Sequence, residues 1–533
     1  MKLVSVAEMK QIEQQAVAAG VSNEQMMRRA GAGVGQWISE MYLEEDPQTV
    51  IGLIGKGNNG GDGLLALRFL LGKGWRAVAV LMGRSESDSL VREFQTAGGE
   101  IVPAPAPAAL ACFQQPEFVQ AILLDAVLGT GIKLPLREEV SQLLHSAAAV
   151  FDGHEVIALD CPSGVDCDSG AAAEEILPAT ATLCIEAVKQ GLVQEPAARY
   201  VGELAVIPLD LPAEKQEDEP KKFIVSAEWV QARLPHRSAF SHKGTFGKVM
   251  VIGGSVNYCG APVMAGNAAY RVGTGLVTLA VPQTVAGWMA SSNPEITWLI
   301  LDEMDGVIAE NAAALIRERA TDYSCLAIGP GIGREETTAA FLTDILLPDQ
   351  AKKRAQTGFV KSAATRNAPE VTWPGIVLDA DGLRWLAEQG NWAGRVNASL
   401  VLTPHPGEMA ALTGLSIAEI QSRRLTIASE FAQKWGQVVV LKGAFTVVAA
   451  PDGRAGVIPV ATSALAKAGS GDVLSGMIAG LLAQGMECFE AAVCGAWIHA
   501  RCGELAEEWT GAAASVLASD LIDCIPEVLQ MIQ

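Results

Sequence analysis

The sequence predicts an α/β protein of two doubly wound domains, each a parallel sheet with helices on both faces. Three observations predict this class. The 533 residues are too many for a single hydrophobic core. Short apolar runs alternate with helical patterns in two separate series. Polar, glycine-rich segments follow many of these runs, and in doubly wound folds ligands bind beyond the carboxyl ends of the strands.

The first series follows an N-terminal helical segment. Its predicted strands are apolar almost throughout, which is typical of parallel strands buried on both faces. They are "QTVIGLIG", "WRAVAVLMG", "AILLDAVLG" and "HEVIALDCPSG", which begin at residues 48, 75, 121 and 154. The segment "EEVSQLLHSAAAV" (138–150) has a helical apolar period and is predicted to connect the last two strands.

The first series ends at "DLPAEKQEDEPKKF" (210–223), which is charged and contains two prolines. Such a composition is typical of a linker, so the predicted domains are 1–215 and 223–533. No short repeat relates the two halves, and we expect two different domains. A basic, weakly patterned insertion at 348–375 interrupts the second series, and we expect it to be a disordered surface loop.

The second series contains six predicted strands and a helix that begins in a glycine-rich turn. The helix is "AGSGDVLSGMIAGLLAQG" (468–485). The strands are "GKVMVIGGS", "GLVTLAVP", "CLAIGPGIG", "GIVLDADGL", "SLVLTPHPGE" and "QVVVLKGAF", which begin at residues 247, 275, 325, 375, 399 and 437.

Charge and composition exclude several classes of partner. The net charge of −21 argues against nucleic acid and anionic membranes, which require clustered Lys and Arg, but it leaves an anionic small molecule open. No apolar run reaches the roughly 18–20 residues that span a bilayer, and the N-terminus lacks the apolar core of a signal peptide. The ten cysteines form no C-x-x-C pair, so we expect reduced thiols and a cytoplasmic protein.

Three strand ends of the first half are rich in polar residues: "GKGNNGGDG", "DAVLGTGIKLP" and "DCPSGVD". Asp125 and Asp160 end two of these strands and are expected to face one crevice. Asn59, Asp125 and Ser163 offer oxygen ligands, which suit K⁺ or Mg²⁺ better than zinc. The backbone amides at the glycine-rich turns can bind an anion, and Asp160 can transfer a proton.

The first glycine loop also allows other interpretations. Gly55, Gly57 and Gly60 fit the G-x-G-x-x-G pattern of a Rossmann NAD(P) site, and Arg84 lies where an NADP 2′-phosphate would need a cation. The glycines could equally serve only to make tight turns. Asp62 argues against simple phosphate binding, because its charge would repel the phosphate. The spacing alone leaves these alternatives open.

In the second half, "AGSGD" precedes an apolar helix. Gly471 and the helix N-terminus can bind an anion, and Asp472 can take a proton from an attacking hydroxyl; Asp472 could also be only an N-cap. Lys442 follows a strand in a turn that suits a nucleotide or forms an ordinary hairpin. His405 lies between two prolines at another strand end and is either structural or catalytic. The sequence contains no Walker P-loop motif.

Taken in order, eight motifs resemble the bifunctional NAD(P)H-hydrate repair enzymes: "NNGGDG", "LGTG", "DCPSG", "GPGIG", "LDADGL", "TPHPGE", "LKG" and "AGSGD". The resemblance covers almost the whole chain. It implies an N-terminal Rossmann-like NAD(P)HX epimerase domain of the YjeF N-terminal family and a C-terminal ribokinase-like, ADP-dependent (S)-NAD(P)HX dehydratase domain. The implied products are NAD(P)H, AMP and phosphate. The insertion at 348–375 is the main departure and touches no matching motif.

The resemblance also implies roles for single residues. The implied catalytic residues are Asp160 and Asp472. K⁺ would be bound by Asn59, Asp125 and Ser163, and Mg²⁺ would accompany ADP. The epimerase would bind the hydrate through Asn58, Asn59, Gly60, Gly61, Asp62, Gly129, Thr130, Gly131, Ile132, Lys133, Leu134, Pro135 and Asp160. The dehydratase would bind the hydrate through Ala261, Gly331, His405 and Asp472, and ADP through Lys442, Gly443, Ala444, Phe445, Thr446 and Gly471.

Two other functions fit parts of the sequence. A ribokinase-like small-molecule kinase with a fused nucleotide-binding accessory domain would explain "AGSGD" but would give the motifs of the first half no role. Alternatively, the first half could be a nucleotide-sensing or scaffold module without turnover. The resemblance implies NADHX, NADPHX and ADP as small-molecule partners, and a homo-oligomer is expected because it is common in such enzymes.

Overall fold

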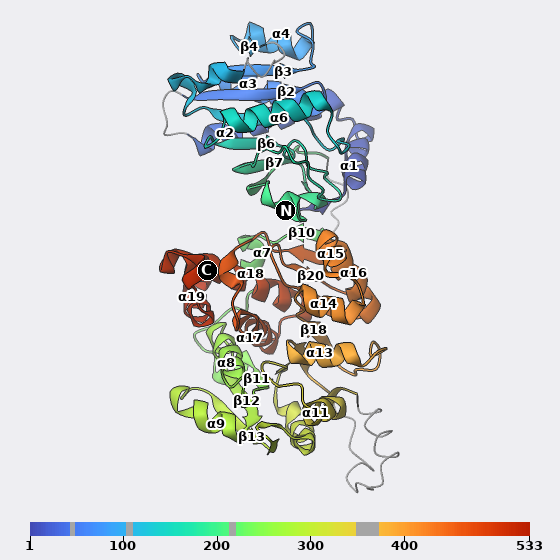
Figure 1. Cartoon of the computed structure of the whole chain (residues 1–533), viewed down its shortest axis with the longest axis vertical. Coiled ribbons are helices and arrows are strands. Elements are labelled where there is room, and N and C mark those ends of the chain that lie inside the picture. The colour runs from blue at the N-terminus through green and yellow to red at the C-terminus, as the bar shows by residue number, and fades with distance from the viewer. Residues whose placement is uncertain (43–47, 103–109, 213–219, 348–371, 533) are drawn as a thin grey trace. The chain divides into compact units, whose positions relative to one another are not determined.

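The computed structural model describes residues 1–42, 48–102, 110–212, 220–347 and 372–532. It divides into two compact units, Met1–Lys222 and Phe223–Gln533 (Figure 1). The middle of the predicted linker and residues 348–371 of the predicted loop at 348–375 lie outside the described residues.

The first unit contains a seven-stranded, wholly parallel sheet in the order β4-β3-β2-β5-β6-β7-β9. The four predicted strands are confirmed and lie at its centre as β2, β3, β5 and β6, whereas β4, β7 and β9 were not predicted. The strands are β2 (Thr49–Gly55), β3 (Arg76–Met82), β4 (Glu100–Val102), β5 (Ile122–Ala126), β6 (Val156–Leu159), β7 (Ala181–Ile185) and β9 (Glu203–Ile207). The short strands β1 (Leu3–Val4) and β8 (Val188–Lys189) pair separately.

Helices cover both faces of this sheet, as predicted for a doubly wound fold (Figure 1). Alternate strand residues point to opposite faces: Val50 and Ile54 pack into one hydrophobic cluster with α2 and α3, and Ile51 and Leu53 into another with α6. The helices are α1 (Val6–Ala18), α2 (Asn23–Met41), α3 (Asn58–Gly72), α4 (Ser89–Thr96) and α6 (Glu138–Val150).

The second unit contains a ten-stranded sheet in the order β10-β21-β20-β19-β18-β17-β16-β11-β12-β13. The six predicted strands are confirmed and pair in parallel, but β20 and β21 add in antiparallel fashion. The strands are β10 (Lys222–Ile224), β11 (Lys248–Ile252), β12 (Leu276–Pro282), β13 (Thr297–Leu301), β16 (Cys325–Ile328), β17 (Gly375–Leu378), β18 (Leu400–Leu402), β19 (Val438–Leu441), β20 (Val447–Ala449) and β21 (Ala455–Val457); β14 (Glu303–Met304) and β15 (Val307–Ile308) form a separate hairpin.

Helices cover this sheet on both faces (Figure 1). On one side lie α8 (Gly260–Arg271), α17 (Ser470–Ala483), α18 (Cys488–Thr510) and α19 (Ala518–Met531); on the other lie α11 (Glu336–Leu346), α13 (Asp381–Glu388), α14 (Pro406–Thr413), α15 (Ile417–Ser422) and α16 (Arg424–Trp435). Shorter helices are α7 (Ala227–Gln231), α9 (Gln283–Met289) and α10 (Ala313–Arg319).

Within the described ranges, no helix is long and apolar enough to cross a bilayer. All ten cysteines lie in the described ranges and none forms a disulfide, as predicted; seven are buried.

Candidate active sites

The first glycine loop brings the start of α3 directly against the sheet. A Cβ atom on Gly60 would overlap the carbonyl oxygen of Gly55, and one on Gly55 would overlap that of Val127. Gly57 is the N-cap of α3 and gives it no side-chain cap. The first turn therefore offers uncapped backbone amides beside the carboxyl ends of β2 and β5, which is an arrangement that can bind an anion.

Gly60→Ala should destabilise the first unit by about 3 kcal/mol or more, because the added methyl group meets backbone atoms that cannot rotate away. Urea unfolding followed by circular dichroism measures this change. Gly57→Ala is the matched control: its φ is −82° and nothing lies within 4 Å of its added Cβ. Equal stability of the two variants would contradict this packing.

Arg84 supports the loop. Its Nη1 donates to the carbonyl oxygens of Gly55 (2.9 Å) and Gly57 (3.1 Å), and its Nε donates to Asp88 (3.2 Å). The side chain is only 8% exposed. The guanidinium is thus engaged with protein atoms, and this removes the main support for an NADP 2′-phosphate site of the Rossmann type.

Asn59, Asp125 and Ser163 are linked through one backbone segment. Ser163 donates from Oγ to Asp125 Oδ1 (2.6 Å) and from its backbone N–H to Oδ2 (2.7 Å). Leu128 donates its N–H to Ser163 Oγ (2.9 Å) and accepts from Asn59 Nδ2 (2.7 Å) through its carbonyl oxygen. Burial raises the pKa of the Asp125 carboxyl, although the hydrogen bonds from Ser163 oppose this. The three predicted K⁺ ligands therefore lie in one oxygen-rich cluster.

This cluster suits an alkali cation more than a transition metal. Its oxygen atoms come from a carboxylate, a hydroxyl, a side-chain amide and a backbone carbonyl, which are hard ligands. No group of three or more His, Cys, Asp or Glu side chains that could bind a metal ion occurs in the described parts of the chain. A zinc-type site is therefore unsupported there, whereas the oxygen cluster fits K⁺.

Asp160 follows β6 with a φ of +64°, a region that residues other than glycine rarely adopt. Its N–H donates to the carbonyl oxygen of Leu183 (2.9 Å). Its Oδ1 accepts hydrogen bonds from the N–H of Ile185 (3.0 Å) and from Lys189 Nζ. Burial lowers the pKa of Lys189, but the ion pair with Asp160 outweighs this and raises the pKa above its usual value.

The charges of Asp160 and Lys189 also influence the carboxyl group of Asp62. Burial raises the pKa of its carboxyl well above the usual value, and the charges of Asp160 and Glu13 add to this rise. Among the described residues, none hydrogen-bonds to its Oδ1. Asp62 is thus a buried carboxyl group whose pKa is raised and whose Oδ1 has no hydrogen-bond partner among the described residues.

The other predicted epimerase residues lie on α3 and on the loop after β5. Asn58 is exposed at the start of α3, while Gly60 and Gly61 are buried. The position of a Cβ on Gly129 lies 3.2 Å from Asn59 Cβ, so this loop begins against α3. The loop residues are half-buried or exposed; they are Gly129, Thr130, Gly131, Ile132, Lys133, Leu134 and Pro135.

In the second unit, Asp472 lies in the first turn of α17, whose N-cap is Gly469 with a φ of +92°. Burial raises the pKa of the Asp472 carboxyl to about 7, and the nearby negative charge of Asp379 contributes to the rise. Gly471 lies beside Lys442, since a Cβ on this glycine would be 3.3 Å from Lys442 Nζ. A carboxyl group with a pKa near neutrality is suited to general base catalysis.

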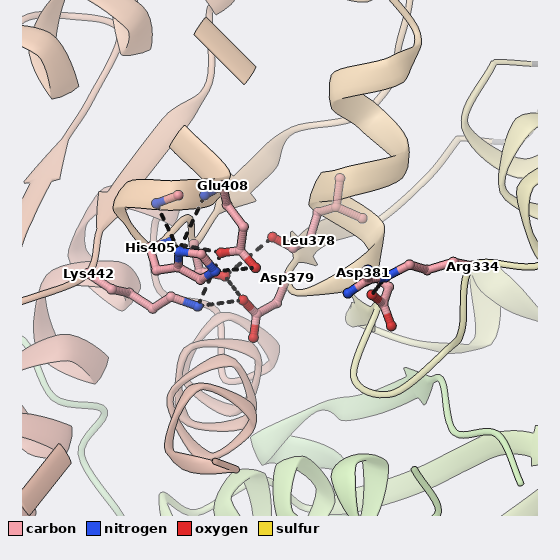
Figure 2. A network of polar contacts seen from close by, with 9 residues as sticks. Arg334, Leu378, Asp379, Asp381, His405, Glu408 and Lys442 are labelled. Carbon is pink, nitrogen blue, oxygen red and sulfur yellow. Dashed lines mark hydrogen bonds and ion pairs between the residues drawn. The ribbon is translucent and has the colours of Figure 1, made fainter. Parts of the chain in front are cut away.

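A network of charged residues surrounds Lys442 (Figure 2). Lys442 Nζ lies 2.9 Å from Asp379 Oδ1 and 3.8 Å from Glu408 Oε2. Thr403 also donates to Asp379 Oδ1 (2.7 Å). Burial lowers the pKa of Lys442, but Asp379 and Glu408 outweigh this and raise it. Ala380, next to Asp379, has a φ of +50°, a strained value of the kind that clusters at functional sites.

A cleft of about 460 Å³ opens beside this network. Three of the four predicted hydrate-binding residues line it, namely Ala261, Gly331 and Asp472. Gly331 has a φ of +62°, and a Cβ there would lie 2.7 Å from the Tyr258 carbonyl oxygen. The other lining residues include Arg334, Asp381, Arg384 and Glu408.

His405, the fourth predicted residue, does not line this cleft. It is the N-cap of α14: its Nδ1 accepts from the N–H groups of Gly407 (3.0 Å) and Glu408 (3.3 Å). Its Nε2 lies 3.3 Å from Glu408 Oε1 (Figure 2). Burial lowers the pKa of the imidazole, and the charge of Lys442 lowers it further. Its structural role is thus evident, and substrate binding by His405 stays a prediction.

The predicted ADP-binding segment connects the antiparallel strands β19 and β20, so the hairpin interpretation holds for its backbone. Gly443 (φ +143°) and Phe445 (φ +51°) both adopt left-handed conformations, and Thr446 Oγ1 donates to the Gly443 carbonyl oxygen (2.8 Å). The same turn directs Lys442 toward the start of α17. A hairpin and a nucleotide site are therefore compatible here; Ala444 lies in the same turn.

Two family profiles match the chain. The profile described as YjeF-related protein N-terminus matches residues 23–191, and the one described as NAD(P)H-hydrate dehydratase matches residues 249–527. A relative from Moorella thermoacetica, named bifunctional NAD(P)H-hydrate repair enzyme Nnr, is 34% identical and covers 100% of this chain and 97% of its own length. The chain belongs to this family. The resemblance inferred from the motifs is confirmed.

Further members of the bifunctional NAD(P)H-hydrate repair family match over most of the chain. The Escherichia coli K12 relative of the same name is 33% identical over 94% of this chain and 86% of its own length. A crystal structure of the ADP/ATP-dependent NAD(P)H-hydrate dehydratase of Bacillus subtilis, co-crystallised with ATP and Mg²⁺, is 31% identical; it covers 58% of this chain and 98% of that chain with a TM-score of 0.45.

Two residues that the structure places at the sites were not predicted from the sequence. Lys189 contacts Asp160, and Asp379 contacts Lys442. Asp379 lies within the quoted motif "LDADGL" at the end of a predicted strand, so its position was a usable signal. Lys189 ends the short strand β8, which follows the unpredicted strand β7, and recognition of "ATLCI" as a strand would have drawn attention to it.

Proposed function

We propose that the chain repairs hydrated NADH and NADPH in two steps. The first unit interconverts (R)- and (S)-NAD(P)HX, and the second dehydrates the (S) form at the expense of ADP to give NAD(P)H, AMP and phosphate. The observation that carries this proposal is Asp472, a buried carboxyl with a pKa of about 7 that lines a cleft at the N-terminus of α17. The shared name of relatives that match along 94% or more of the chain supports it.

In the second unit, Asp472 would accept the proton of the hydrate's hydroxyl group as that oxygen attacks the terminal phosphoryl group of ADP, and AMP leaves. The α17 amides and Lys442 would stabilise the charge on the transferring group. The ring nitrogen's electron pair then expels phosphate, and loss of a proton from the neighbouring carbon restores the double bond. Mg²⁺, bound with ADP, would neutralise phosphate charge, and the carboxylate of Glu408 is a suitable oxygen ligand.

In the first unit, the uncapped amides of α3 would hold the phosphates of the hydrated nucleotide, and the loop 129–135 would close over it. Asp160 would transfer the proton that accompanies inversion of the hydroxyl-bearing ring carbon. Asn59, Asp125 and Ser163 would hold K⁺, whose positive charge would offset the negative charge of the phosphates.

Replacement of K⁺ by Li⁺ should slow epimerisation by about tenfold or more, because the oxygen cluster around Asp125 would lose a cation that fits it. Dehydration of pure (S)-hydrate by the same protein should keep its rate and serves as the internal control. Conversion of (R)- to (S)-hydrate, followed by chromatography without ADP, measures the first rate. An unchanged epimerisation rate without K⁺ would contradict this assignment.

The decisive test of the second activity uses (S)-hydrate and ADP. The proposal expects one NADH and one free phosphate for each ADP consumed. A kinase with an accessory domain would instead release no phosphate and accumulate a phosphorylated product. If the chain binds the (R)-hydrate without converting it, the first unit is a sensing or scaffold module.

The ten cysteines form no disulfide, which suits a reducing compartment, so the cytoplasm is the location that we propose. A homo-oligomer remains a prediction, and light scattering of the purified chain measures its mass.

A further inference from the structure

We propose that Lys189 is a positioning residue of the epimerase site. It would fix the Asp160 carboxylate through Oδ1 and leave Oδ2 to exchange a proton with the hydrate, without touching the hydrate itself. The inference rests on the proposed function of the first unit. It adds a residue that lies outside every motif of the first half.

The contacts of Asp160 are asymmetric. Its Oδ1 accepts from Lys189 Nζ and from the N–H of Ile185 (3.0 Å), while none of the described residues hydrogen-bonds to Oδ2. Lys189 is fixed in turn, because its Nζ also donates to the Ile185 carbonyl oxygen (3.0 Å). The backbone of Ile185 therefore contacts both side chains: its N–H donates to Asp160, and its carbonyl oxygen accepts from Lys189. The φ of +64° at Asp160 is maintained by this arrangement.

The burial of Lys189 requires an explanation. Its side chain is 1% exposed, whereas that of Asp160 is 14% exposed and so reaches the surface of the site. A lysine rarely loses its water unless its charge is paired. Asp62 and Glu13 are the other carboxyl groups that influence this region, yet the hydrogen bond of Lys189 goes to Asp160. The buried lysine thus holds in place a carboxylate that is itself partly exposed.

The test compares the full-length variants Lys189→Met and Lys189→Arg with Lys10→Met, an exposed lysine of α1, as the matched control. Lys189→Met should lower the epimerisation kcat by about 100-fold. The KM for the hydrate should stay within about twofold, since Lys189 does not touch it. Dehydration of (S)-hydrate by the same protein should be unchanged, and this rate also reports the amount of active chain.

A double variant separates positioning from an independent role. If Lys189 acts through Asp160, then Lys189→Met should cause no further loss in an Asp160→Asn background. A wild-type kcat in Lys189→Met would overturn the inference, and so would losses that multiply in the double variant. If the wild type does not epimerise at all, the proposed function itself fails, which is a different outcome.

Removal of the lysine leaves a carboxylate without its partner, so Lys189→Met could unfold the first unit. Loss of that unit's thermal transition would reveal this. Lys189→Arg, which keeps the positive charge, then decides: a lower kcat at unchanged KM supports the inference, and a wild-type kcat overturns it.

Discussion

Asp472→Asn should lower the kcat of dehydration by about 1,000-fold while the chain still interconverts the two hydrates. The variant keeps the shape of the side chain but cannot accept a proton from the attacking hydroxyl group. NADH formation from pure (S)-hydrate and ADP measures the loss. Asp452→Asn, which changes an exposed carboxylate paired with Arg454, is the control and should keep wild-type activity.

The pH dependence of the wild type tests the same role independently. The pKa of the Asp472 carboxyl is about 7, and only its ionised form can act as a base. The dehydration rate should therefore rise between about pH 6 and pH 8, as the proton is lost. A rate that is flat or falls over this range would contradict the assignment of Asp472 as the base.

Asp160→Asn should lower the epimerisation kcat by a factor of about 100 to 10,000. The amide keeps an oxygen that can accept from Lys189 but no longer exchanges the proton. With ADP present, this variant should return NADH promptly from the (S)-hydrate alone. Asp152→Asn, an exposed position that precedes β6, is the matched control. Wild-type conversion of (R)-hydrate by Asp160→Asn would exclude this aspartate as the proton-transfer group.

The central strands of both sheets could be predicted because they are buried on both faces. Strands β2 and β5 are almost uninterrupted apolar runs, which is the signal that such burial produces. The peripheral strands lack it: β9 and β13 are partly exposed, and β4 has only three residues. The antiparallel addition of β20 and β21 depends on a tight turn, which the sequence alone does not distinguish from a binding loop.

In the candidate sites too, residues marked by a local sequence pattern could be predicted, whereas contacts between distant residues could not. Asp160 and Asp472 were predicted because each is a carboxylate where a strand ends or a glycine-rich turn starts a helix. The pairing of Lys442 with Asp379 joins residues 63 positions apart and required the fold. Lys189 was missed because no motif contains it. His405 shows the opposite case, since its ring caps α14, a role that its proline-flanked position did not indicate.

The most direct test of the two-step account is the extent of NADH recovery from an equal mixture of (R)- and (S)-hydrates with the wild-type chain, ADP and Mg²⁺. The account predicts that absorbance of NADH rises until both epimers are consumed, with one free phosphate for each NADH. Recovery that stops when the (S) form is exhausted would show that the first unit does not epimerise. Consumption of ADP without NADH would contradict the repair function as a whole.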